Sequence, residues 1–184
     1  MTETAHKSRL PRTGTLVLIA VVLLIGGGAM MVWLPYHRNQ QAIAEIERLG
    51  GKAVSEILRP FWMPNAVDDE YLTVFERVIE VDLIDTQISD AGLHHLRGLT
   101  NLEYLWLFET QVGDAGLMHL RGLTKLGYLS LDDTHVSDAG IEHLRGMIKL
   151  QSLYLNHTQV TKAGIEKLQK ALPSCDIDWT IPAK

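Results

Sequence analysis

A 24-residue repeat restricts this chain to a small number of folds. The tripeptide Asp-Ala-Gly returns at residues 90–92, 114–116 and 138–140, and an apolar stretch follows each copy. A unit of this length is too short to enclose a hydrophobic core, so each copy must cover the apolar face of its neighbour. We therefore expect an elongated stack of similar units.

Each copy contains two different hydrophobic periods. The copies begin at residues 78, 102, 126 and 150, and their first six residues read VIEVDL, LEYLWL, LGYLSL and LQSLYL. The second half of this frame alternates apolar with polar or aromatic residues, which predicts a short strand. Further along, leucines recur at every third residue, which predicts a short helix or helical turn. These leucines are Leu93, Leu96 and Leu99 in one copy and Leu117, Leu120 and Leu123 in the next.

The frame and the period resemble the leucine-rich-repeat family. The residues that match its core frame are Leu102, Leu105, Leu107, Leu126, Leu129, Leu131, Leu150, Leu153 and Leu155. The resemblance covers residues 78–172 and implies an α/β fold, a leucine-rich-repeat solenoid of short parallel strands and short helices. Where the family usually has Asn or Cys after the strand, Thr stands at residues 86, 110, 134 and 158, which looks like bacterial members with a T-x-[IV]-x-D-x-G-[LI] turn. A threonine ladder is expected to replace the asparagine ladder.

The repeated Asp-Ala-Gly is expected to shape the start of each helix. Its aspartates should cap free backbone N–H groups, with a preceding Ser or Thr as the alternative cap. These candidate caps are Asp90, Asp114 and Asp138, then Ser89, Ser137 and Thr161. The glycines at 92, 116, 140 and 164 are expected where helix and strand layers approach closely or where a turn needs an unusual φ. Lys162 replaces the aspartate in the last copy, which should weaken the cap of an end repeat.

The ends of a stack need covers, because a bare end exposes apolar faces. Residues 41–51 have apolar positions at helical spacing and end on glycine, so they predict an N-terminal cap helix. Residues 54–77 are interpreted as a degenerate repeat, which makes 36–77 the cap helix and degenerate repeat before the leucine-rich repeats at 78–172. Pro173 ends the last helix, and residues 173–184 are predicted to supply a C-terminal cap strand and tail, with Ile177 and Trp179 pointing inward.

Residues 15–34 form a run of 20 residues without a charge, which at about 1.5 Å per residue spans a bilayer core of roughly 30 Å. We interpret residues 13–35 as a transmembrane signal anchor that follows a cytoplasmic tail, residues 1–12. The alternative is a cleaved signal peptide with its cleavage site at Gly27-Gly28-Ala29, but the apolar run continues past that point to Leu34. Lys7, Arg9 and Arg12 precede the segment, which favours a single-pass membrane protein with its N-terminus in the cytoplasm and its repeat domain outside, periplasmic or extracytoplasmic.

The part of the chain beyond the apolar segment is acidic. Three of the 17 Lys and Arg residues and one of the 22 Asp and Glu residues precede residue 36, which leaves a net charge of about −7 on the remainder. Nucleic-acid binding needs clustered Lys and Arg, so no nucleic-acid partner is expected. Cys175 is the single cysteine, so no intramolecular disulfide can form.

The strand positions between the frame leucines should all face one inner surface of the solenoid. They are Glu80, Asp82, Ile84, Tyr104, Trp106, Phe108, Tyr128, Ser130, Asp132, Ser152, Tyr154 and Asn156. Exposed aromatic patches tend to mark contact sites, so these positions, without Ile84, are our candidate partner-binding residues. Two alternatives remain, cross-strand aromatic packing that only stiffens the sheet and a cover supplied by the N-terminal segment. The carboxylates favour a partner with basic groups, or a sugar stacked on the rings.

No catalytic constellation, phosphate-binding loop or cofactor motif is present, so an enzyme is not expected. His95, His119 and His143 recur in successive copies, but a repeat generates such ladders automatically, and we predict solvated surface there in place of a metal site. The sequence predicts a membrane-anchored, non-enzymatic interaction module for a protein or peptide. The alternatives are a structural envelope protein that self-associates and a glycan-binding module.

Overall fold

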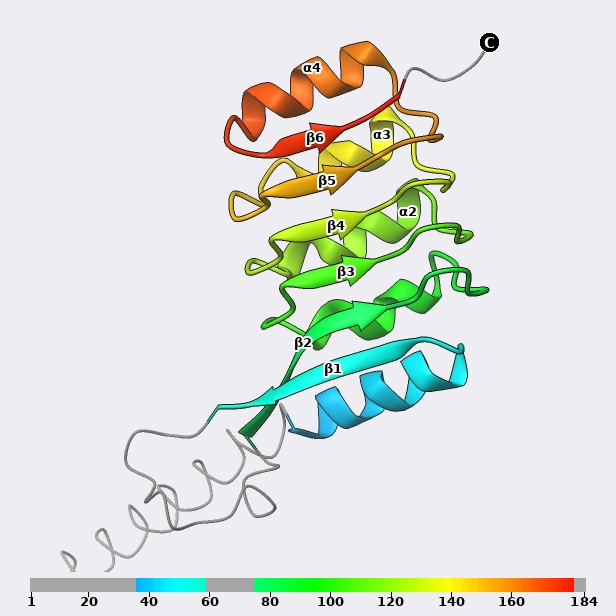
Figure 1. The fold of residues 1–184 in the computed structure, drawn as a ribbon, viewed down its shortest axis with the longest axis vertical. Coiled ribbons are helices and arrows are strands. Elements are labelled where there is room, and N and C mark those ends of the chain that lie inside the picture. Colours follow the sequence, from blue (N-terminus) through cyan, green and yellow to red (C-terminus); the bar gives the residue numbers. More distant parts are fainter. Residues whose placement is uncertain (1–35, 59–74, 181–184) are drawn as a thin grey trace, which may run out of the picture.

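The repeats stack into one elongated sheet that is lined by helical segments (Figure 1). The structure is a computed structural model that describes residues 36–58 and 75–180. The sheet has six strands in chain order, which are β1 (Lys52–Ile57), β2 (Glu76–Asp82), β3 (Tyr104–Trp106), β4 (Tyr128–Ser130), β5 (Ser152–Tyr154) and β6 (Asp176–Asp178). The helical segments are residues 36–48, η2 (Gly92–Gly98), α2 (Asp114–Leu117), η3 (Met118–Gly122), α3 (Asp138–Ile141), η4 (Glu142–Leu144) and α4 (Lys162–Ala171).

Strands β2 to β6 are parallel, and each pairs with the strand of the preceding turn. Tyr104 lies opposite Tyr128, and Leu105 lies opposite Leu129, so equivalent positions of neighbouring copies form rows across the sheet. The predicted α/β solenoid with short parallel strands is confirmed.

The predicted transmembrane anchor lies outside the described residues, as do most of residues 59–77. No helix within the described ranges is both long and apolar enough to cross a membrane.

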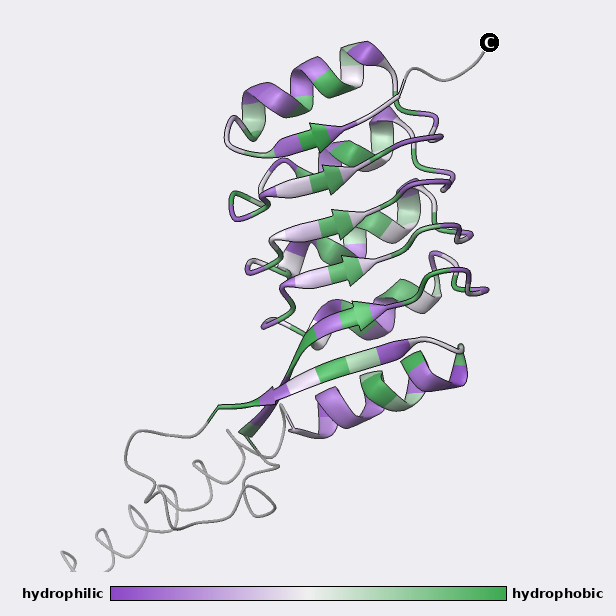
Figure 2. Cartoon of the chain, in the orientation of Figure 1, coloured by the Kyte–Doolittle hydropathy of each residue, from purple (hydrophilic) through white to green (hydrophobic). Residues whose placement is uncertain are grey.

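The core lies between the sheet and the helical segments. All nine frame leucines are buried, and so are the leucines that recur at every third residue. Each short strand carries one strongly apolar residue between two more polar ones (Figure 2). One side of each strand therefore faces the core, and the other side faces away from it.

The start of the solenoid differs from the sequence interpretation. Strand β1 runs antiparallel to β2, with a register shift at Val54/Ser55, so residues 52–57 are not the strand of a further parallel repeat. Val54 is 48% exposed because it alternates with Ala53, which packs against the core, and therefore lies on the other side of the strand, opposite Glu80. Helix 36–48 instead covers the first end of the core, and it buries Ala42 and Ile46 there.

A tight turn follows each of the strands β2 to β5, and the sequence pattern did not reveal it. Asp85, Glu109, Asp133 and His157, spaced by 24 residues, all adopt a left-handed backbone with φ between 52° and 57°. The buried threonine that follows each of them donates its hydroxyl to the leucine carbonyl three residues earlier, at 2.6–2.8 Å. The threonines therefore close the turn within their own repeat and do not form the expected ladder between repeats, because their one proton is already used.

The aspartates of the repeated tripeptide also act differently from the expected caps. Asp114 is the first residue of α2, which has no side-chain cap, and its carboxylate reaches the next repeat. There it accepts hydrogen bonds from the backbone N–H of Ser137 at 2.7 Å and from the Ser137 hydroxyl at 2.6 Å. Asp138 makes the same two bonds to Thr161, and Asp90 accepts the N–H of Gly113. The carboxylates therefore join neighbouring repeats.

The Ser and Thr residues supply caps only in the later copies. Ser137 accepts the N–H of Ala139 at 3.3 Å, and Thr161 accepts the N–H of Gly164 at 3.2 Å. Ser89 does not cap η2. Lys162 takes the aspartate's position in the last repeat of the described chain. No further repeat follows there to donate hydrogen bonds to a carboxylate, and this explains the loss of the aspartate better than a weakened cap does.

The glycines at 116, 140 and 164 make room for these carboxylates, whereas a Cβ on Gly92 would meet the Ile88 side chain at 2.7 Å. A Cβ on Gly116 would lie 2.6 Å from Asp90 Oδ1, and a Cβ on Gly140 would collide with the Asp114 carboxylate and lie 3.1 Å from its Cα. Gly164 stands in the same relation to Asp138. None of these glycines has a positive φ, so close packing between repeats, and not an unusual backbone angle or a helix–strand contact, requires them.

This packing predicts that Gly140→Ala lowers the free energy of unfolding by about 1–3 kcal/mol, since a side chain must be forced into an occupied site. Gly146→Ala is the matched control, because nothing lies within 4 Å of its Cβ position. The control should be neutral or stabilise the fold by up to about 1 kcal/mol, because alanine restricts the unfolded chain. Denaturant unfolding monitored by circular dichroism measures both, and equal effects of the two substitutions would contradict the packing.

Candidate functional site

The strand register places the predicted inner-face residues on one surface in three rows. The first row is Glu80, Tyr104, Tyr128 and Ser152, and the second is Asp82, Trp106, Ser130 and Tyr154. The third row follows the strand ends and is Ile84, Phe108, Asp132 and Asn156. Most of these side chains are partly exposed. Ser130 is an exception at 4% exposure, so it supports its neighbours more than it offers a contact.

The aromatic rings in the middle of this face are held in fixed positions. The Tyr104 and Tyr128 rings stack with their centroids 4.8 Å apart and 12° between their planes. The Trp106 Nε1–H donates to Glu80 Oε1 at 3.2 Å, which turns the indole toward β2. The aromatic rings therefore do pack across the strands, which is one of the two alternatives to a binding site. Tyr104, Trp106 and Tyr128 nevertheless each keep part of their surface exposed. The other alternative, a cover from the N-terminal segment, concerns residues outside the described ranges.

Carboxylates gather at the carboxyl ends of the strands. Asp132 Oδ1 accepts the backbone N–H of Asn156 at 2.6 Å, and the Ser130 hydroxyl donates to Oδ2 at 3.4 Å. Burial raises the pKa of Asp132 above its usual value, these hydrogen bonds oppose that rise, and the nearby negative charge of Asp178 adds to it. Asp132 and Asp178 thus lie close enough for their charges to interact, and a cation of a partner would be favoured at this edge.

Basic groups gather at the opposite edge, and the sequence analysis missed them. A hollow of about 450 Å³ beside the stacked tyrosines is bordered by Lys125 and Lys149 as well as Glu103 and Gln151. Lys125 Nζ donates to Asn101 Oδ1 at 2.9 Å. The signal was present in the sequence, because Arg77, Asn101, Lys125 and Lys149 are spaced by 24 residues and each precedes a frame residue. The inner face therefore has a basic edge, an aromatic centre and an acidic edge.

The histidines on the helical side do not form the regular ladder that the repeat suggested. The rings of His94 and His95 lie 3.8 Å apart, and His94 is 6.5 Å from His119. His143 instead bonds to Arg121 at 2.6 Å. In the described part of the chain, no group of three or more His, Cys, Asp or Glu residues is arranged to hold a metal ion.

A parallel sheet that gains one strand per 24 residues, with buried frame leucines and one helical segment per turn, defines the class of the protein. This chain has the leucine-rich-repeat fold.

Among solved structures, this chain is similar to two bacterial internalins and to a plant receptor-kinase ectodomain. Internalin C2 of Listeria monocytogenes is 28% identical over 49% of this chain and 38% of its own, with a TM-score of 0.41. A second internalin of that organism (inlF) is 20% identical over 59% of this chain and 38% of its own, with a TM-score of 0.43. The leucine-rich-repeat ectodomain of the receptor kinase SOBIR1 from Arabidopsis thaliana is 11% identical over 80% of this chain and 97% of its own, with a TM-score of 0.43.

This chain thus spans 38% of the length of either internalin. Neither a protein-family model nor a curated protein matches the sequence.

Proposed function

We propose that this protein is a membrane-anchored, non-enzymatic interaction module that binds a polypeptide segment on the inner face of its sheet. The proposal rests on one observation, which is that the scaffold residues repeat from copy to copy whereas the residues of the inner face do not. The core leucines, the turn threonines and the inter-repeat aspartates repeat from copy to copy, whereas the three inner positions read Glu-Asp-Ile, Tyr-Trp-Phe, Tyr-Ser-Asp and Ser-Tyr-Asn. Residues that vary on an otherwise repeated scaffold are free to specify a partner.

The side chains of the inner face indicate which groups a partner would need. An apolar or aromatic side chain would lie on the Tyr104–Tyr128 stack and beside Trp106, whose positions are already fixed by stacking and by the bond to Glu80. Fixed rings lose little conformational entropy on binding, which favours affinity. A basic group of the partner would lie toward Asp132, and an acidic group would lie toward Lys125 and Lys149.

A photo-crosslinking amino acid in place of Tyr128, in the full-length chain and in the cells that make it, tests the binding face. We expect a discrete adduct heavier than the chain, and no such adduct when the same group replaces Met118, which is 51% exposed on η3. A second substitution, Trp106→Ala, should reduce the adduct at least about tenfold, because truncation of a hot-spot aromatic residue costs about 2 kcal/mol or more. Ile148→Ala, an apolar residue 80% exposed outside this face, is the control and should leave the adduct unchanged.

The mass of the adduct distinguishes the alternatives. An adduct of twice the mass of the chain would identify a second copy and support the self-associating envelope protein. Equal adducts from both positions, or no protein adduct from Tyr128, would contradict a polypeptide-binding face. In the latter case a glycan becomes the better candidate.

The membrane anchor is the second part of the proposal and rests on the uncharged residues 15–34, which end just before helix 36–48. Extraction of membranes with alkaline carbonate tests it. The chain should stay in the membrane pellet, because a spanning helix is inserted in an effectively irreversible way. Release of the full-length chain into the supernatant, or a mature N-terminus near residue 30, would contradict the anchor and favour the cleaved signal peptide.

A further inference from the structure

The aromatic stack on the inner face has one open end. Tyr104 and Tyr128 are equivalent residues of neighbouring strands, and their ring centroids lie 4.8 Å apart, which is one strand spacing. Rings that stack at equivalent positions turn their faces along the row that crosses the sheet. One outer face of the pair is therefore turned toward Glu80 on β2, and the other is turned toward Ser152 on β5.

The two ends of the stack differ in what lies beside them. At the β2 end, the Glu80 carboxylate is already used, because it accepts the Trp106 Nε1–H at 3.2 Å. At the β5 end, Ser152 carries only a hydroxymethyl group, which is too short to cover a ring. Among residues 36–58 and 75–180, no second ring and no cation of the chain contacts the Tyr128 ring. The face of Tyr128 toward β5 is therefore open to a partner.

A carboxylate lies on the far side of the place above Ser152. Asp176 pairs with Ser152 in the parallel register of β5 and β6, so it continues the same row beyond Tyr128. Ile177 packs against the core, which puts Asp176 and Asp178 on the inner face, where both are exposed. In the part of the chain that the structure describes, neither of these carboxylates accepts a hydrogen bond or forms an ion pair. A group above Ser152 would thus meet a ring on one side and a free carboxylate on the other.

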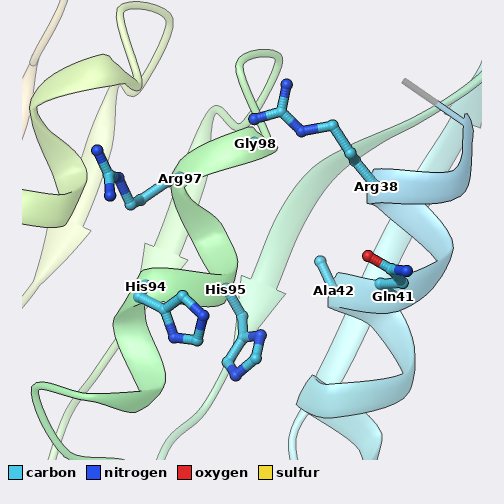
Figure 3. A pocket seen from close by; sticks show the side chains of 7 residues that line it. All are labelled: Arg38, Gln41, Ala42, His94, His95, Arg97 and Gly98. Carbon is cyan, nitrogen blue, oxygen red and sulfur yellow. The ribbon is translucent and has the colours of Figure 1, made fainter. Parts of the chain in front are cut away.

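Cations of the chain itself lie away from this place. Arg38 and Arg97 line a pocket of about 400 Å³ where helix 36–48 meets η2, on the helical side of the sheet. Figure 3 shows that Arg97 points away from Arg38 there, so this pocket does not gather its charges on one group. Lys149, at the basic edge of the inner face, precedes Ser152 by three residues, which is about 10 Å along an extended strand. The pair of Tyr128 and Asp176 is therefore left for a cation of the partner.

We propose that the polypeptide on the inner face presents an arginine side chain, which lies above Ser152 between the Tyr128 ring and the Asp176 carboxylate. A guanidinium is planar and charged, so it stacks on a tyrosine face and also donates N–H groups to a carboxylate. A lysine ammonium has no flat face to stack, and an aromatic side chain has no charge for Asp176. The proposal rests on the proposed function, because it names one side chain of the polypeptide that this face binds.

The test titrates the full-length chain, in a non-ionic detergent without aromatic groups, at constant pH and ionic strength. The probes are N-acetyl-Gly-Arg-Gly-amide and the same peptide with lysine or citrulline in place of arginine. Lysine keeps the charge without the planar end, and citrulline keeps the planar end without the charge. The ring signal of 13C-labelled Tyr128, identified by its loss in Tyr128→Phe, should shift saturably with the arginine peptide at a Kd on the order of 10 mM. The other two peptides should bind about two- to fivefold more weakly.

Two pairs of variants locate the arginine. Asp176→Asn should raise the Kd of the arginine peptide about two- to fivefold and leave that of the citrulline peptide unchanged. Glu166→Gln, which removes an equal charge from an exposed position of α4, is its control and should change neither. Ser152→Tyr adds a third ring to the row and should abolish the saturable shift of Tyr128. Ala163→Tyr adds the same ring at an exposed position of α4 and should leave that shift intact.

Equal affinities for the three peptides, no saturable shift with the arginine peptide, or wild-type binding by Ser152→Tyr would overturn the proposal. A polypeptide adduct from the photo-crosslinker at Tyr128 would still form in that case, so the arginine can be wrong while the binding face is right. Unchanged circular dichroism spectra of the variants show that loss of binding is not loss of the fold.

Discussion

The bond between an aspartate of one repeat and the backbone of the next is the interaction on which the rest of this solenoid depends. Asp114 accepts two hydrogen bonds from Ser137, and Gly140 lacks the side chain that would displace the carboxylate. Hydrogen bonds to a charged acceptor are stronger than neutral ones, and these are partly shielded from water. Both partners recur in each inner repeat, so the tripeptide can be copied unchanged. Each copy fixes the distance and the angle to its neighbour.

Two surfaces follow from this arrangement. The repeated contacts between copies involve the core, the turns and the helical side. The inner face adds contacts that are not repeated, which are the Tyr104–Tyr128 stack and the Trp106–Glu80 hydrogen bond, so its side chains can differ from copy to copy. Their order, from basic edge to aromatic centre to acidic edge, would give the polypeptide of the proposed complex one preferred direction. The second surface arises where the regular contact between repeats stops. Helix 36–48 covers the first repeat there, and a pocket lined by Arg38, His95 and Arg97 lies where it meets η2.

The periodic features of the fold could be predicted from the sequence, and the contacts between repeats could not. The spacing of Leu105, Leu129 and Leu153 was enough to place the strands and the core, because burial of apolar side chains determines both. The roles of Asp114 and Thr134 were missed, since a period shows that residues are equivalent but does not show which atom of the next repeat lies within reach. The direction of β1 was also missed, because an alternating strand has the same pattern in either direction. On the candidate site, the aromatic and acidic residues were anticipated from the strand positions. The lysine edge was not, because Lys125 and Lys149 precede the frame and lie outside the strands.

A double-mutant cycle on Asp114 and Gly140 tests the central claim most directly. The free energy of unfolding of the full-length chain would be measured for Asp114→Ala, Gly140→Ala and the double variant. If the glycine exists to accommodate the carboxylate, removal of the aspartate relieves much of the alanine penalty, and the two effects should fail to add by at least about 1 kcal/mol. If the two penalties add within about 0.3–0.5 kcal/mol, as independent sites do, the carboxylate and the glycine are not coupled and the account of the stack is wrong.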